Sequence, residues 1–243
     1  MHSIAYKNNL KEKLYPVLFF SVVIFLLTYW FNSFPNFIHL VTDYLFDTKF
    51  PFSWNHGFAA LLTAVICFNI FKKNSIHFLG NQPLIAITLS VIPALLYFIV
   101  GIENELGYNS HIWGALYIFF TFCYNCMEEL AWRGFLYDVL GDLNIWFKGI
   151  IIGILWSIWH LLIFDDFAQF NGFYVFSLLC ILISILMCHL KNKTGSLLIV
   201  ISFHTILVTQ DITVTIILIV LFLSTFIFWN RLKIIKNKNI IED

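Results

Sequence analysis

The sequence predicts an all-helical integral membrane protein with about eight transmembrane helices and with both termini in the cytoplasm. The first observation is composition: of 243 residues, 60% are hydrophobic and only 12% are charged, about half the charged fraction usual in soluble domains. The second is a series of apolar runs long enough to cross a bilayer. The third is an uneven distribution of lysine and arginine between alternate loops.

The apolar runs define eight spans within one polytopic domain, residues 1–243. A spanning helix needs about 20 mostly apolar residues, and lipid offers no partners for unpaired backbone groups, so each run should be helical. A barrel would require alternating polarity, which these continuously apolar runs lack. The predicted spans cover residues 15–34, 52–71, 83–100, 112–137, 148–164, 172–190, 196–208 and 212–229.

The first span resembles a signal peptide because lysines precede an apolar run. The run is long for the apolar part of a signal, and no small-x-small cleavage site follows it. We therefore interpret it as a retained first helix.

The loops between the spans set the orientation. Positive residues favour the cytoplasm, so the lysine-rich side, which includes both ends of the chain, is predicted to face inward. That side holds Lys7, Lys11, Lys13, Lys72, Lys73, Lys148, Lys191, Lys193, Arg231, Lys233, Lys236 and Lys238. The other side holds Lys49, together with Glu103, Glu105, Asp165, Asp166 and Asp211. Removing one span would scramble this asymmetry.

Other features of the composition give little information about function. The formal net charge is zero, which argues against nucleic acid as a partner. The five cysteines all fall in apolar runs and are interpreted as small buried residues.

The fourth span contains charges that a bilayer disfavours. Glu128, Glu129 and Arg133 occur together there, and each charge costs about 2.5–3.5 kcal/mol on insertion scales. Glu129 and Arg133 are four residues apart, so they share a helix face and can form an ion pair. Glu128 points about 100° away, which leaves it as the carboxylate available for chemistry. Asn125 precedes both glutamates by one helical turn and could hydrogen-bond either one, or act as a polar contact between helices.

Two histidines lie at a similar depth in other spans, His160 in the fifth and His204 in the seventh. Counted from charged residues at the cytoplasmic interface, Glu128 lies about 15 Å deep, His160 about 18 Å and His204 about 16 Å. All three fall near the middle of a core about 30 Å thick. A carboxylate and two imidazoles from three helices can therefore converge on one site.

The packing of the fifth span supports this convergence. Gly149, Gly153 and Ser157 form a stripe of small residues that lets a neighbouring helix approach closely. The tryptophans near the presumed site, which we attribute to packing rather than substrate contact, are Trp132, Trp156 and Trp159.

Such a site suits hydrolysis of a peptide bond. Glu128 would act as general base on a water, one histidine would hold that water, and the other would stabilise the developing oxyanion. Arg133 would hold Glu129, which would be a supporting residue or a substitute base. A metal-assisted version would use His160, His204 and Glu128 to hold a divalent ion such as zinc, although the usual H-E-x-x-H pattern is absent.

These residues resemble the CAAX protease and bacteriocin-processing family, which is related to type II CAAX prenyl endopeptidases. The matching motifs lie between residues 124 and 208: Glu128-Glu129-x-x-x-Arg133, Trp156-x-x-x-His160 and His204-x-x-x-Val208. The resemblance implies an eight-helix fold with a conical cavity, and Glu128 and His160 as the principal catalytic pair. The sequence departs from the family at Val208, where asparagine is expected, so Thr205 or Thr209 would have to supply a polar group there.

The sequence thus predicts an intramembrane endopeptidase that cleaves a membrane-associated peptide or protein. Abundant Ile, Phe, Lys and Asn hint at a low-GC bacterium, with the protein in its plasma membrane and bacteriocin or pheromone processing among its roles. Two alternatives remain: an inactive membrane partner or immunity protein of the same fold, which Val208 motivates, and a small proton-coupled transporter whose Glu and His residues relay protons.

Overall fold

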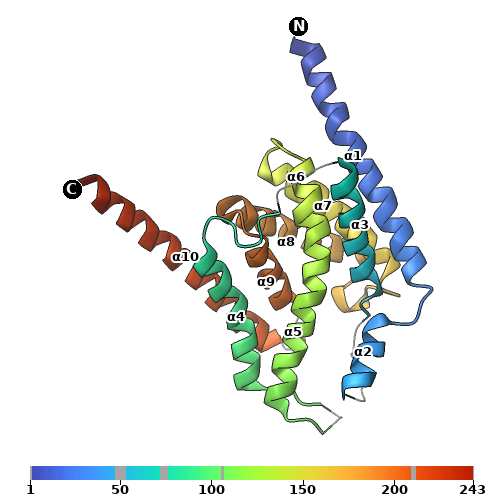
Figure 1. Ribbon diagram of the computed structural model, residues 1–243, viewed down its shortest axis with the longest axis vertical. Coiled ribbons are helices and arrows are strands. Elements are labelled where there is room, and N and C mark those ends of the chain that lie inside the picture. Colours follow the sequence, from blue (N-terminus) through green and yellow to red (C-terminus); the bar gives the residue numbers. More distant parts are fainter. Residues whose placement is uncertain (1, 47–52, 72–75, 105–106, 209–211, 243) are drawn as a thin grey trace. The chain divides into compact units, whose positions relative to one another are not determined.

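The computed structural model describes residues 2–46, 53–71, 76–104, 107–208 and 212–242. Over these residues the chain consists of helices and the turns that join them, without a β-strand, as predicted (Figure 1). The helices in chain order are α1 (His2–Phe31), α2 (Phe37–Phe46), α3 (Asn55–Phe71), α4 (Pro83–Val100), α5 (Ser110–Glu129), α6 (Tyr137–Val139), α7 (Ile145–Trp159), α8 (Phe173–Thr194), α9 (Leu197–Leu207) and α10 (Ile212–Glu242).

Among the described helices, five are long and apolar enough to cross a membrane. They are Lys13–Phe31, Pro83–Val100, Ile145–Leu162, Phe173–Thr194 and Ile212–Trp229. Two further apolar helices, α3 and α9, are shorter than a usual span. The multi-pass helical class is therefore confirmed, whereas the count of eight and the orientation of the termini stay predictions.

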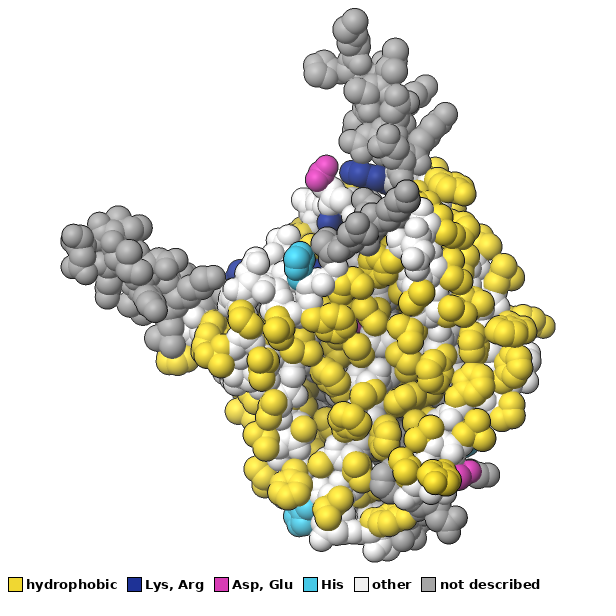
Figure 2. All heavy atoms as spheres, in the orientation of Figure 1, with side chains coloured by type: hydrophobic (Ala, Val, Ile, Leu, Met, Phe, Trp, Pro, Cys, Tyr) yellow, Lys and Arg dark blue, Asp and Glu magenta, His cyan; other side chains and the backbone are white. Residues whose placement is uncertain are grey.

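The surface of these helices is suited to lipid. Large hydrophobic side chains are exposed along them, for example Leu84 and Ile99 on α4 and Ile216 on α10. Figure 2 shows hydrophobic side chains covering most of the described part of the face in view. Apolar surface on this scale is unfavourable in water, so a bilayer is the environment that this chain requires.

Two predicted element boundaries were wrong in an informative way. The span predicted at 112–137 is not one regular α-helix, because α5 ends at Glu129 and a π-helix continues over Leu130–Leu136. The span predicted at 148–164 begins three residues earlier, since Asn144 caps it by accepting a hydrogen bond from the Trp146 backbone at 2.9 Å.

The short helix α2 was not predicted. Its ten residues are too few to cross a bilayer, so a search for spanning runs does not indicate it. Asn55, at the start of α3, organises this region: its amide donates to the Phe31 and Phe34 carbonyls at 3.0 and 2.9 Å, and its oxygen accepts from the Phe37 backbone at 3.0 Å.

The described contacts divide the chain into two compact units. Unit 1 comprises Met1–Ile76 and Cys126–Lys193, and unit 2 comprises His77–Asn125 and Thr194–Asp243. The single domain over residues 1–243 stays a prediction.

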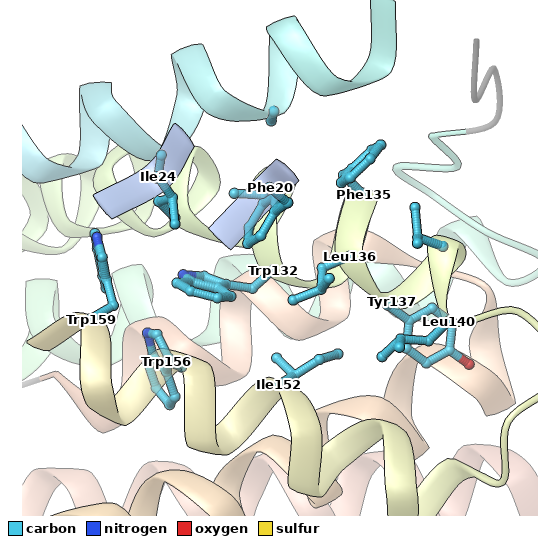
Figure 3. Close-up of a cluster of buried hydrophobic side chains, with 14 of the residues drawn as sticks. Phe20, Ile24, Trp132, Phe135, Leu136, Tyr137, Leu140, Ile152, Trp156 and Trp159 are labelled. Carbon is cyan, nitrogen blue, oxygen red and sulfur yellow. The ribbon is translucent and has the colours of Figure 1, made fainter. Parts of the chain in front are cut away.

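Unit 1 is built around aromatic packing between α1, α3, the π-helix and α7. Trp132 is fully buried, and its ring lies 5.3 Å from that of Phe20 and 5.6 Å from that of Trp159 (Figure 3). The Trp159 indole nitrogen donates to Thr28 Oγ1 at 2.7 Å. These contacts anchor α1 to the elements that carry the candidate site.

The predicted stripe of small residues on α7 is confirmed as a helix contact. A Cβ atom on Gly149 would lie 2.5 Å from Ile185 Cα, and one on Gly153 would lie 2.6 Å from Ile181 Cα. Only glycine permits α8 to approach this closely.

Unit 2 packs α4, α9 and α10 against one another. A hydroxyl pair, Ser90 and Ser202 at 2.7 Å, joins α4 to α9. Ser196 caps α9 by accepting from the Ile199 backbone at 3.2 Å, and its own hydroxyl donates to the Phe78 carbonyl at 2.8 Å. The helix that carries His204 is therefore held at its start and along its length.

Candidate active site

Three ionisable side chains of the first motif are buried where α5 passes into the π-helix. Glu128 is 2% exposed, while Glu129 and Arg133 are fully buried. A π-helical segment inside a longer helix often marks a functional site. Its wider turn changes the direction in which the side chains that follow it point. Here it begins directly after the two glutamates and contains the arginine.

The predicted ion pair between Glu129 and Arg133 is confirmed. Arg133 Nη1 donates to Glu129 Oε1 at 2.8 Å, with both side chains fully enclosed. The guanidinium carbon also lies 4.8 Å from the centre of the Trp156 ring, a cation–π contact that is strong where water is excluded. Arg133 Nε and Nη2 find no hydrogen-bond partner among the described residues. A buried guanidinium with two unused donor nitrogens has capacity for a further acceptor.

Glu128 is oriented by Trp156, which was interpreted from the sequence as a packing residue. The indole nitrogen of Trp156 donates to Glu128 Oε2 at 3.2 Å. Trp156 therefore contacts Glu128 through its N–H and Arg133 through its ring face. The signal for this role was present in the sequence, since Trp156 is the aromatic residue of the second motif.

His160 follows at the end of α7, in a short 3-10 turn over His160–Leu162. Its Nδ1 lies 2.7 Å from the Trp156 carbonyl oxygen. A carbonyl only accepts hydrogen bonds, so Nδ1 carries the proton and Nε2 presents its lone pair in the neutral ring. The spacing of four residues between Trp156 and His160 thus sets the tautomer as well as the position of the imidazole.

Aromatic side chains enclose the His160 ring. Its centroid lies 5.0–5.3 Å from those of Trp156, Trp159, Phe164 and Phe176. Phe164 and Phe176 come from the two sides of the loop between α7 and α8, and both pack on Phe167 within it. The imidazole is therefore held in an apolar setting, where its hydrogen bonds are stronger than in water.

The third motif lies on α9, in unit 2. His204 is 5% exposed, and its neighbour Thr205 is almost fully buried. Thr205 Oγ1 donates to the Ile201 carbonyl at 2.9 Å and accepts from Asn125 Nδ2 at 3.2 Å. Asn125 thus uses its amide as a polar contact between α5 and α9, whereas its Oδ1 has no hydrogen-bond partner in the described part of the chain.

The position that departs from the family pattern is the last residue of this motif. Val208 caps the C-terminus of α9 and is 44% exposed. Thr209, the alternative polar group, lies outside the described residues. That leaves Thr205 as the described threonine near His204.

The structure thus brings Glu128, Glu129, Arg133 and His160 into unit 1 around Trp156. His204 belongs to unit 2, and its convergence with Glu128 stays a prediction. Within the described ranges, no three His, Cys, Asp or Glu side chains are grouped so that they could hold a metal ion. The metal set of His160, His204 and Glu128 therefore also stays a prediction, and no catalytic step is derived through it.

These features define a class: a multi-pass helical membrane protein with a buried carboxylate pair, a buried arginine and an enclosed histidine. Residues 94–209 match the family model described as Type II CAAX prenyl endopeptidase Rce1-like. The match contains all three motifs and confirms the resemblance to the CAAX protease family. No curated protein and no solved structure matches the chain.

Proposed function

We propose that this protein is an intramembrane endopeptidase in which Glu128 activates water. The observation that carries the proposal is Glu128 itself, a carboxylate 2% exposed and oriented by the Trp156 indole. Its position beside the buried Glu129–Arg133 ion pair and its hydrogen bond from Trp156 place it among the residues of the two motifs. The Rce1-like match over residues 94–209 supports a protease, because endopeptidase is in the description of that family.

In the proposed reaction, Glu128 takes a proton from water as the water oxygen attacks the carbonyl carbon of a peptide bond. His160 Nε2 accepts a hydrogen bond from the same water and orients it. His204 donates to the oxyanion of the tetrahedral intermediate. When the C–N bond breaks, the protonated Glu128 returns its proton to the leaving amine.

The remaining residues hold this arrangement. Trp156 orients both Glu128, through its indole N–H, and His160, through its backbone carbonyl. Arg133 holds Glu129 through their ion pair at 2.8 Å. The proposed substrate is a peptide or protein segment at the membrane, because His160 lies on a helix, Ile145–Leu162, that is long and apolar enough to cross one. The proposed location is a bacterial plasma membrane.

The test compares Glu128→Gln with wild type in proteoliposomes. We measure the release of fragments from a panel of membrane-anchored peptides by mass spectrometry, with and without a chelator. Removal of a general base should lower the rate about 10²–10⁴-fold. Glu103→Gln is the matched control, because Glu103 is an exposed loop residue outside the motifs, and it should leave the rate unchanged.

The outcome also separates the alternatives. An inactive partner protein would release no fragments and would keep its cellular phenotype in the Glu128→Gln form. A transporter would move substrate into liposomes without cleaving it. A wild-type rate in Glu128→Gln would rule out Glu128 as the base, and a loss of wild-type rate with chelator would show that a metal takes part.

A further inference from the structure

Basic side chains gather at the end of unit 1 that contains the loop between α6 and α7, and the proposed catalysis does not use them. Lys148, near the start of α7, and Lys191, near the end of α8, are only 7% and 6% exposed. Their ammonium nitrogens lie 4.0 and 6.0 Å from the centre of the same ring, that of Tyr137. The Tyr137 hydroxyl donates to Asn192 Oδ1 at 3.4 Å, which ties α6 to α8.

Two ammonium groups buried to this degree require compensation, because removing an ion from water costs several kcal/mol. Among the described residues, neither Lys148 nor Lys191 forms an ion pair or a hydrogen bond. Asp138 interacts electrostatically with both. Asp142 also acts on Lys148, and Glu129 also acts on Lys191, but Glu129 is already paired with Arg133.

A third lysine adds to the excess of positive charge. Lys13 of α1 acts on Lys148 electrostatically, and its own partner is Asp142 at 4.0 Å. The Asp142 side chain is 98% exposed, so solvent and salt weaken its influence. Lys13, Lys148, Lys191 and Arg133 are four cations, and the carboxylates that act on them are Asp138, Asp142 and Glu129, which leaves one surplus positive charge.

The ammonium groups are nevertheless reachable. Neither belongs to the fully enclosed polar atoms that lack a hydrogen-bond partner, so each keeps a path to the surface. On the face shown in Figure 2, the visible Lys and Arg side chains lie at its upper edge rather than over its apolar middle. This is the side that the loop charges assign to the cytoplasm.

We propose that Lys148 and Lys191 bind an anionic phosphate group, with the Tyr137 ring as one wall and Lys13 as a third cation. Lysine is a common phosphate ligand because its ammonium offers three donors on a compact charge. At the cytoplasmic surface of a membrane, phosphates occur in two forms, as headgroups of anionic phospholipids and as soluble phosphates. The site is independent of the proposed peptidase activity.

The experiment uses the full chain purified in detergent and two probes. Phosphatidylglycerol binding is measured by native mass spectrometry against phosphatidylcholine, which carries no net charge. Sodium phosphate is tested by its effect on the melting temperature, against sodium chloride at the same ionic strength. The variants are Lys148→Gln and Lys191→Gln, and Lys193→Gln is the matched control because Lys193 is exposed on the same end of α8.

Each glutamine variant should weaken binding about tenfold, the effect of losing one charge-assisted hydrogen bond. Lys193→Gln should change it less than about twofold, since an exposed lysine contributes little. An effect confined to phosphatidylglycerol identifies a lipid headgroup, and stabilisation by sodium phosphate identifies a soluble phosphate. An equal loss in Lys193→Gln, or binding of neither probe to wild type, would overturn the proposal.

A measurement on the wild-type protein tests the site without relying on variants that could fail to fold. Lysine acetylation by a water-soluble reagent is mapped by mass spectrometry with and without the probe that binds. The phosphate group should protect Lys148 and Lys191 and leave Lys193 reactive. Equal modification of all three, with and without the probe, would contradict the assignment.

Discussion

At the residue scale, the candidate site depends on a tryptophan with several contacts. Trp156 donates to Glu128, lies against Arg133 and accepts from His160 through its carbonyl. The backbone contact survives any substitution at this position, whereas the indole N–H does not. The side-chain hydrogen bond can therefore be tested separately from the position of His160.

Trp156→Phe should lower kcat about tenfold with a smaller change in KM, because it removes one hydrogen bond to a charged group and keeps an aromatic ring. Steady-state peptide cleavage measures both constants. Trp146→Phe, at an exposed position on the same helix, is the control and should be neutral. An unchanged kcat in Trp156→Phe would mean that the indole N–H has no part in catalysis.

Arg133 gives a prediction about stability rather than rate. Arg133→Met leaves Glu129 buried without its cation, which should cost about 3–5 kcal/mol of unfolding free energy. Adding Glu129→Gln should recover much of that loss, because no net charge then remains. Denaturation in mixed micelles measures the free energies, and failure of the second substitution to restore stability would show that the ion pair is not the cause.

At the element scale, the close contact between α7 and α8 supports both sites proposed in unit 1. Gly149 and Gly153 let the α8 backbone lie directly against α7. This contact places Lys148 near Lys191 at one end of the two helices and His160 near Phe176 at the other. The stripe of small residues therefore helps to position side chains at both ends of the α7–α8 pair.

Gly153→Ala should destabilise the protein by about 1–3 kcal/mol, because its Cβ would overlap the Ile181 backbone and the helices would have to separate. A thermal melt in detergent measures the change. Ile154→Ala, at the next and half-exposed position, controls for a general effect of substitution on α7. Equal melting temperatures for wild type and Gly153→Ala would contradict the tight packing.

At the scale of the whole molecule, the need for a lipid environment and the orientation in the membrane depend on different features of the chain. The apolar surface requires lipid, and five described helices meet the criteria for a span. The sidedness of the loops instead depends on lysines and arginines that act during insertion. Orientation is therefore tested by labelling loops from one side of the membrane, because helix packing does not determine it.

Two single cysteines in a cysteine-free background test that orientation. A membrane-impermeant maleimide added to intact cells should label Asp165→Cys and spare Lys193→Cys. Permeabilised cells should show labelling of both. Labelling of Lys193→Cys in intact cells, or of both cysteines from one side, would contradict the eight-span topology with a cytoplasmic N-terminus.

Several features of the structure follow from local rules and were predictable. The pairing of Glu129 with Arg133 follows from a spacing of four on a helix. The close approach of α7 and α8 follows from glycines at the same spacing. The helical class follows from apolar runs that have no other means of satisfying their backbone in lipid.

Other features depend on contacts distant in sequence and were not predictable. The π-helix after Glu129 and the short helix α2 break the regular period on which span prediction relies. The bond between Trp156 and Glu128 joins residues 28 positions apart, and the clustering of Lys148 and Lys191 at Tyr137 joins three elements. Composition and periodicity alone establish that this chain is a helical membrane protein with charges inside a span, because the cost of polar groups in lipid acts on each segment separately. The neighbours of those charges depend on helix packing, which combines side chains from distant segments and leaves no local signature.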